Sequence, residues 1–372
     1  MKGVAICLRG LENVCANEVK EIIKCKSKVN DTALVFDIKS QNDLAKFTYL
    51  SQSAVKVLYL LDEIKVDNDL NITLKELEKN IKKIDFGDWL KDRTFKVNCK
   101  RIGNQIYSTQ DLAAMTGEYI IDNTKAKVSM TDPDIVIYMY IYNDKCYLGI
   151  DFSGFDLSKR DFKVFTHPTS LNSTLAYSLI RFGGYKKGTI LDPFCGAGSI
   201  PLEAALYKNQ KSPHFYKKDK FIFHHFLDID LEKFDDETKK EKKKIEVIGS
   251  DHLLKFVKSS KNNAKLAGIE KKINITRMDL EWLDTKLEEK SIDLIVTNPP
   301  SESRMHDSKK IEKIFKEFYY QAKYIMKKTG KIVFCVQKDK IAKLVLENFK
   351  ITDDFSVWQG KMEMKVLVLE FA

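Results

Sequence analysis

The sequence lacks features that define several classes of protein. Its longest uninterrupted apolar run, residues 135–142, has eight residues, whereas a helix that crosses a bilayer needs about 20. Its seven cysteines stand singly and form no Cys-x-x-Cys pair, which argues against a zinc knuckle and a disulfide framework. Near the N-terminus, Lys2 and Arg9 interrupt the apolar stretch that a secretion signal requires. We therefore expect a protein without a membrane segment, in the reducing cytoplasm.

The sequence also lacks a metal-binding pattern. His224 and His225 are adjacent rather than four residues apart, and no pattern of acidic residues accompanies them, so a surface or partly packed pair is the simpler interpretation. Cys195 has no basic residue near it in the sequence, and we interpret it as a packing residue rather than a nucleophile. We expect no metal ion.

The positive charge is concentrated in one half of the chain. The net charge is +10, and residues 1–165 carry 25 Lys and Arg against 24 Asp and Glu. The excess of Lys and Arg over Asp and Glu therefore falls in residues 166–372. This excess fits a polyanionic partner such as nucleic acid, because lysine and arginine side chains bind phosphates. Solvated lysine surfaces are commoner than binding patches, so charge alone does not identify the partner.

The length of 372 residues suggests two or three folded units, at roughly 100–200 residues each. Short apolar stretches alternate with helical ones in residues 1–52 and again in 53–155, which predicts α+β structure. From residue 166 onward, strands and helices alternate in the manner of a parallel sheet covered on both faces. Residues 208–244 are lysine-rich and too long for an ordinary crossover. We interpret them as an insertion, whose charge is most simply that of a solvated surface helix.

The most informative segment is residues 190–205, ILDPFCGAGSIPLEAA. A short apolar strand runs into a glycine turn and then a helix, so Gly196 and Gly198 allow a ligand to approach the backbone. The third glycine of the dinucleotide-binding pattern is absent, and Asp192 stands where it would repel a pyrophosphate. The pattern therefore favours a cationic cofactor without phosphates.

Two more carboxylates end the next two predicted strands. Asp251 follows residues 246–249, and Asp279 follows residues 273–277. A carboxylate at the second strand can accept both ribose hydroxyls, and one at the third can accept an exocyclic amine of adenine. Each acid alone is more often a helix cap or turn residue, but three successive strand ends beside a glycine turn indicate a nucleoside-binding site.

The fourth predicted strand, residues 294–297, runs into Asn298, Pro299 and Pro300. The prolines remove two N–H donors and stiffen the loop, so the Asn298 side-chain oxygen and the Pro299 carbonyl can both accept from one NH₂ group. An isolated Asn-Pro-Pro is more simply a stiff turn capped by its asparagine. Its place after a strand in this order favours a site that orients an amine.

These segments resemble those of class I S-adenosylmethionine-dependent methyltransferases of the amino-methylating type. The resemblance implies an α/β fold with a Rossmann-like seven-stranded sheet, and it implies that Asn298, Pro299 and Pro300 are catalytic residues at the target amine. Residues 167–176, HPTSLNSTLA, resemble the segment in which a helix N-terminus meets the cofactor carboxylate. The residues implied at the cofactor are Asp192, Pro193, Cys195, Gly196, Gly198, Asp251, His252, Asp279, Leu280 and Asn298.

The first half resembles a THUMP domain preceded by a small α+β ferredoxin-like domain. The segments that carry this resemblance are residues 94–103 (TFKVNCKRIG), 108–113 (STQDLA), 132–137 (DPDIVI) and 148–154 (LGIDFSG). THUMP domains are tRNA-binding modules that grip the acceptor end. The two resemblances together imply a ferredoxin-like domain at residues 1–52, a THUMP domain at 53–155 and a methyltransferase domain at 156–372.

The pairing is similar to RNA guanine-N2 methyltransferases, especially the archaeal and bacterial enzymes that modify an acceptor-stem guanosine of tRNA. It implies transfer of a methyl group from S-adenosylmethionine to the exocyclic N2, with positioning rather than a metal supplying the acceleration. The residues expected to bind RNA are Lys100, Arg101, Arg160 and Arg304. The alternatives are an rRNA guanine-N2 or adenine-N6 methyltransferase and an inactive RNA-binding protein. A monomer is the expected assembly.

One departure from the amino-methylating pattern concerns the target base. The motif usually continues with an aromatic residue after the second proline, and its ring stacks on the flipped base. Here the chain continues with Ser301, Glu302, Ser303 and Arg304. We hypothesise that Arg304 lies over the base plane instead. The departure also weakens the case for adenine as the target.

Overall fold

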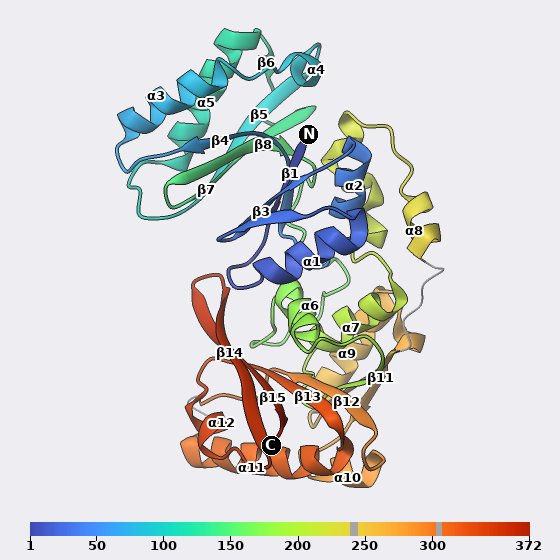
Figure 1. Cartoon of the computed structure of the whole chain (residues 1–372). Helices are drawn as coiled ribbons and strands as arrows, with labels where there is room; N and C mark the ends of the chain where they lie inside the picture. Colours follow the sequence, from blue (N-terminus) through green and yellow to red (C-terminus); the bar gives the residue numbers. More distant parts are fainter. Residues whose placement is uncertain (239–244, 303–306) are drawn as a thin grey trace. The chain divides into compact units, whose positions relative to one another are not determined.

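The computed structural model describes residues 1–238, 245–302 and 307–372. The chain divides into two compact units, each built on one sheet with helices packed against it (Figure 1). The first unit consists of Met1–Cys7, Cys15–Leu157 and Tyr216–Leu231, and the second of Leu8–Val14, Ser158–Phe215 and Glu232–Ala372.

An eight-stranded sheet forms the first unit, in the order β2-β3-β1-β4-β8-β7-β5-β6. Its strands are β1 (Lys2–Ile6), β2 (Ser27–Asn30), β3 (Ala33–Asp37), β4 (Lys56–Lys65), β5 (Thr94–Ile102), β6 (Lys127–Val128), β7 (Ile135–Tyr142) and β8 (Lys145–Asp151). β1 pairs antiparallel with both β3 and β4. The two regions expected as successive α+β domains therefore share one sheet.

The helices of residues 1–157 are α1 (Glu12–Ile23), α2 (Gln41–Leu50), α3 (Leu70–Ile81), α4 (Gly87–Leu90) and α5 (Thr109–Thr124). The Ser108 hydroxyl accepts hydrogen bonds from the amides of Gln110 and Asp111 and so caps the start of α5. The short helix α4 begins at Gly87, directly after the buried Phe86.

Residues Tyr216–Leu231, which we name the aromatic strap, belong to the first unit although the chain on both sides belongs to the second. The strap includes most of η1 (Phe215–Lys220) and all of η2 (Ile222–His225), both 3₁₀ turns. Its Phe221 and Phe223 are buried and stacked, with ring centroids 4.9 Å apart. Part of the expected insertion, residues 221–223, is therefore buried in the first unit, while the lysine run at residues 239–244 that suggested a solvated helix lies outside the described residues.

The second unit is built on a seven-stranded sheet, in the order β11-β10-β9-β12-β13-β15-β14. Its strands are β9 (Gly188–Asp192), β10 (Ile245–Asp251), β11 (Asn274–Arg277), β12 (Ile292–Thr297), β13 (Met326–Val336), β14 (Phe349–Gln359) and β15 (Met362–Phe371). The strands from β11 to β13 run parallel, and β15 is antiparallel to both of its neighbours. This arrangement confirms the expected seven-stranded sheet.

Helices cover both faces of this sheet. In the described residues, the helices of the second unit are α6 (Ser173–Phe182), α7 (Ser199–Asn209), α8 (Glu232–Thr238), α9 (Leu254–Leu266), α10 (Leu283–Lys286), α11 (Ser308–Ile325) and α12 (Lys340–Leu344). The adjacent residues Leu294 and Ile295 of β12 belong to two different clusters of buried side chains, because successive strand residues point to opposite faces. Burial on both faces explains the run of apolar residues 294–296 within β12.

Candidate active site

The carboxyl ends of β9, β10 and β12 lie at one edge of the second unit's sheet. β9 stands between the other two strands, and the change of direction in strand order at this point is where open α/β sheets bind ligands. Asp192 ends β9, Asp251 ends β10, and Asn298 directly follows β12. The structure thus places these three residues at neighbouring strand ends.

Asp192 is a buried carboxyl, only 2% exposed. Its Oδ1 accepts hydrogen bonds from the Thr297 hydroxyl at 2.7 Å and from the Phe194 amide at 3.2 Å. Burial raises the pKa of the Asp192 carboxyl to about 7, and the Asp251 carboxylate contributes to this rise, while the two hydrogen bonds oppose it. A cation placed beside Asp192 would favour the charged form of its carboxyl.

The glycine turn connects β9 to α7. Gly196 and Gly198 have φ values of +53° and +89°, a region that favours glycine. A Cβ on Gly198 would lie 2.2 Å from the Ser260 hydroxyl oxygen, so a side chain does not fit there. Cys195, which precedes this pair, is buried, and burial raises the pKa of its thiol well above the ordinary value. A neutral, buried thiol fits the interpretation of Cys195 as a packing residue.

Asp251 is bound to the glycine turn. Its carboxylate accepts from the Gly196 amide at 3.1 Å and from the Leu253 amide at 2.8 Å, while the neighbouring His252 is exposed. At the third strand, Asp279 is exposed and stands just before the 3₁₀ turn η4 (Leu280–Trp282). Asp251 is therefore held in place by the turn, whereas Asp279 is presented to solvent.

Asn298 is half-buried, and Pro299 after it is buried. Its Nδ2 donates to the Thr169 carbonyl at 3.2 Å. The hydroxyl of the preceding residue, Thr297, donates to Asp192 at the end of β9. The residue that holds Asp192 and the residue that carries the side-chain amide are therefore neighbours in the chain. Sequence analysis identified Asp192 and Asn298 but missed Thr297, because a threonine at the end of an apolar strand carries no distinguishing signal.

Side chains from other elements hold the segment that precedes α6. Asn263 of α9 exchanges two hydrogen bonds with the Phe165 backbone and donates to the Ala197 carbonyl in the glycine turn at 3.0 Å. Gln359, at the end of β14, accepts from the Asn172 amide at 2.6 Å. These contacts hold the segment before α6 next to the glycine turn and the end of β14. Sequence analysis missed Asn263 and Gln359, since isolated amides form no pattern.

The residues expected to bind RNA differ in exposure. Lys100 is exposed on β5, while the half-buried Arg101 packs over a tyrosine ring and donates to that residue's carbonyl. Arg160 is buried and forms a bidentate ion pair with Glu203, at N–O distances of 2.9 and 3.2 Å. This pairing contradicts the expectation that Arg160 binds RNA, because its guanidinium is neutralised where solvent does not reach. Arg304 lies outside the described residues.

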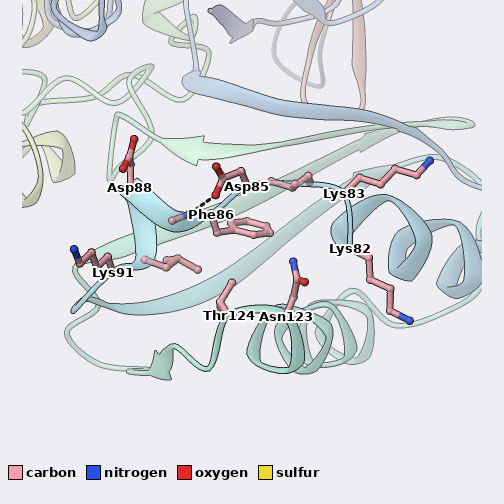
Figure 2. A pocket seen from close by; sticks show the side chains of 11 residues that line it. Lys82, Lys83, Asp85, Phe86, Asp88, Lys91, Asn123 and Thr124 are labelled. Carbon is pink, nitrogen blue, oxygen red and sulfur yellow. Dashed lines mark hydrogen bonds between the residues drawn. The ribbon is translucent and has the colours of Figure 1, made fainter.

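A cavity of about 700 Å³ lies in the first unit, where the ends of α3 and α5 meet α4 (Figure 2). It is lined by Lys82, Lys83, Ile84, Asp85, Phe86, Gly87, Asp88, Leu90, Lys91, Asn123 and Thr124. Its three lysines are exposed and outnumber its two aspartates. Figure 2 shows the Phe86 ring in the middle of the lining and the lysine amino groups toward its periphery. We name this cavity the lysine-rimmed pocket.

Among residues 1–238, 245–302 and 307–372, none of the helices is long and apolar enough to span a membrane. The same residues include no group of three or more His, Cys, Asp and Glu side chains suited to a metal ion. None of the seven cysteines, all of which lie in the described residues, forms a disulfide bond.

Comparison with known proteins agrees with the fold. Residues 160–365 match the family described as UPF0020, RMKL-like, methyltransferase domain, and residues 71–151 match the THUMP domain. The first match covers more than half of the chain, and the chain belongs to this family of methyltransferases. In addition, it carries a THUMP domain.

The curated relatives match nearly the whole chain. It is 30% identical to the tRNA (guanine(6)-N2)-methyltransferase of Methanocaldococcus jannaschii over 97% of both chains. It is 25% identical to the protein of the same name from Archaeoglobus fulgidus, over 96% of this chain and 89% of that one. The crystal structure of SMU.472 complexed with SAH has a TM-score of 0.82 at 18% identity and covers 100% of this chain and 98% of that one, which supports the fold.

Proposed function

We propose that this chain is a tRNA (guanine-N2)-methyltransferase that uses S-adenosylmethionine and modifies guanosine 6 in the acceptor stem. Family membership, the THUMP match and the names of two relatives that match nearly the whole chain support this proposal. The observation that carries it is the junction of β9 and β12. There Thr297 holds the buried Asp192, and the next residue, Asn298, presents an oriented amide. The carboxyl proposed to bind a cation, Asp192, is therefore close to the amide proposed to bind an amine, Asn298.

The strand-end residues suit S-adenosylmethionine, which supplies an activated methyl group when bound. The buried Asp192 suits a cationic donor, because a nearby positive charge favours its carboxylate. Asp251, fixed by the Gly196 amide, suits the ribose hydroxyls, and the exposed Asp279 suits the adenine amine. The proposed donor-binding residues are Asp192, Pro193, Cys195, Gly196, Gly198, Asp251, His252, Asp279, Leu280 and Asn298.

Asn298, Pro299 and Pro300 form the proposed catalytic loop. The Asn298 side-chain oxygen and the Pro299 carbonyl accept the two N–H groups of the guanine amine, and Pro300 stiffens the loop that carries them. Held in this way, the amine keeps its lone pair available for the methyl group. Orientation of a flipped guanosine against a bound donor supplies most of the acceleration.

We propose that residues 53–155 grip the tRNA. The lysine-rimmed pocket lies inside the THUMP match at residues 71–151, and exposed lysines bind phosphates. Lys100 is exposed on a strand of the same unit. Seven cysteines without a disulfide bond among them fit the cytoplasm as the compartment, because thiols stay reduced there.

Methyl transfer from labelled S-adenosylmethionine to unmodified tRNA transcripts, followed by nucleoside mass spectrometry, tests the proposal. We expect N2-methylguanosine at position 6. Asn298→Ala should lower turnover more than about 100-fold while donor binding persists, and the exposed Asn274 offers the matched control Asn274→Ala. Full turnover by Asn298→Ala would refute its role. Label in rRNA alone would favour an rRNA enzyme, and donor binding without transfer would favour an inactive RNA-binding protein.

A further inference from the structure

A turn formed by residues 167–169 contacts both parts of the proposed site. The His167 imidazole lies against the glycine turn, since a Cβ on Gly196 would be 3.6 Å from its ring. Two residues later, the Thr169 carbonyl accepts the hydrogen bond from Asn298 Nδ2 at 3.2 Å. The turn therefore lies between the donor-binding glycines and the catalytic amide.

The contact with Thr169 determines which way the Asn298 amide faces. A backbone carbonyl can only accept a hydrogen bond, so only the NH₂ end of the amide can face Thr169. Asn298 Oδ1 must then point away from Thr169, and Oδ1 is the atom that has to accept from the target amine. A reversed amide would lose its bond to Thr169 and would set one NH₂ group against another.

His167 in turn holds Thr169. The Thr169 amide donates to His167 Nδ1 at 3.1 Å, and the Thr169 hydroxyl lies 2.9 Å from the same nitrogen. Because an amide N–H can only donate, Nδ1 must accept, and the proton of the neutral ring resides on Nε2. The Phe256 ring, with its centroid 4.1 Å from that of His167, supports the imidazole from the side.

We propose that His167 is a positioning residue for methyl transfer. Its Nδ1 holds the Thr169 backbone, and the Thr169 carbonyl holds the Asn298 amide with Oδ1 turned toward the target amine. This inference rests on the proposed function, because it takes Asn298 as the group that binds the amine. His167 acts on that amine only through Asn298.

Protonation of His167 would break this chain of contacts, because a hydrogen on Nδ1 would meet the N–H of Thr169. Burial lowers the pKa of His167, and Lys255 contributes to that lowering while Asp251 opposes it. Among the described residues, Asp251 and Lys255 are the charged groups that shift the pKa of the imidazole. The contacts of Thr169 with His167 Nδ1 are therefore kept near neutral pH and lost in acid.

Two substitutions at His167 distinguish the role of its aromatic ring from the role of its hydrogen-bond acceptor, Nδ1. H167F keeps an aromatic ring beside Phe256 but has no acceptor, whereas H167N keeps an oxygen close to the position of Nδ1. We expect H167F to lower kcat about 10- to 100-fold, with the KM for tRNA and the Kd for S-adenosylmethionine within about threefold of wild type. H167N should restore kcat to within about threefold. The exposed His225 provides the matched control, H225F, with unchanged kcat.

Wild-type kcat in H167F would overturn the proposal, and so would a loss of donor binding as large as the loss of kcat, since that would make His167 a donor-site residue. Failure of the proposed function is read separately, from the nucleoside that the wild type produces. The kcat comparison uses whichever RNA the wild type methylates, so the identity of the substrate does not affect it.

The pH profile decides the matter if H167F does not fold. At saturating donor, the ratio of wild-type kcat to that of H167N should be constant near neutrality and fall only in acid, at a pH lower than 6.5, because burial holds the pKa of His167 below that ordinary value. Both proteins contain Asp192, so its titration cancels in the ratio. A ratio that stays flat down to about pH 5 would overturn the proposal.

Discussion

At the scale of single residues, the buried Asp192 makes stability depend on pH. Burial raises its pKa from 3.8 in the unfolded reference to about 7, so folding favours the protonated carboxyl. The stability that this group contributes at low pH is therefore lost as the pH rises from about 4 through about 7. In Asp192→Asn, the amide oxygen can still accept from Thr297 and Phe194, because both donate to the same oxygen, Oδ1.

We expect Asp192→Asn to be more stable than the wild type without donor, by a margin that grows by roughly 2–3 kcal/mol between about pH 5 and pH 8. Urea unfolding at the two pH values measures this margin. Calorimetric titration should show that the same variant binds S-adenosylmethionine at least tenfold more weakly, since it has lost the negative charge. A margin that does not change with pH would show that the carboxylate ionises at no cost.

At the scale of elements, the aromatic strap is held by buried rings. Phe223 is fully buried and packs against Phe152 of the first unit, with centroids 6.1 Å apart. Phe223→Ala should cost about 3–5 kcal/mol and detach the strap, which hydrogen exchange would show as faster exchange in residues 216–231. His225→Ala, at an exposed neighbour, is the control and should leave exchange unchanged. Equal protection in both variants would mean that the strap is held by other contacts.

The elements also show how far sequence alone leads. The strand-end acids and Asn298 could be predicted, because a glycine turn and parallel-strand periodicity are local signals. β2 could not, because Ser27–Asn30 is a short polar strand at the sheet edge. The burial of the strap's phenylalanines could not be predicted, because the rings that they contact are distant in the sequence. Arg160 was predicted to bind RNA because its ion-pair partner, Glu203, is 43 residues away in the sequence and no local pattern links the two.

At the scale of the whole molecule, RNA binding and methyl transfer are proposed for different units, so they can be disturbed separately. The chain passes between the units at residues 7–8, 14–15, 157–158, 215–216 and 231–232. A fragment that ends at residue 155 would therefore lack the strap. For this reason the RNA-binding surface is best tested by charge substitutions in the full chain.

The lysine-rimmed pocket gives that test. We expect replacement of Lys82, Lys83 and Lys91 by glutamine to weaken tRNA binding and to reduce the slope of log K against log salt by roughly one for each phosphate that these lysines bind. Binding titrations between low and moderate salt measure the slope. The value of kcat at saturating tRNA and the affinity for the donor should not change, because the proposed catalytic and donor-binding residues belong to the other unit.

The control replaces three other exposed lysines of the first unit, Lys26, Lys28 and Lys39. An equal change in both triple variants would mean that total charge, rather than the pocket, attracts the RNA, and an unchanged slope in the pocket variant would remove the pocket from the RNA-binding surface.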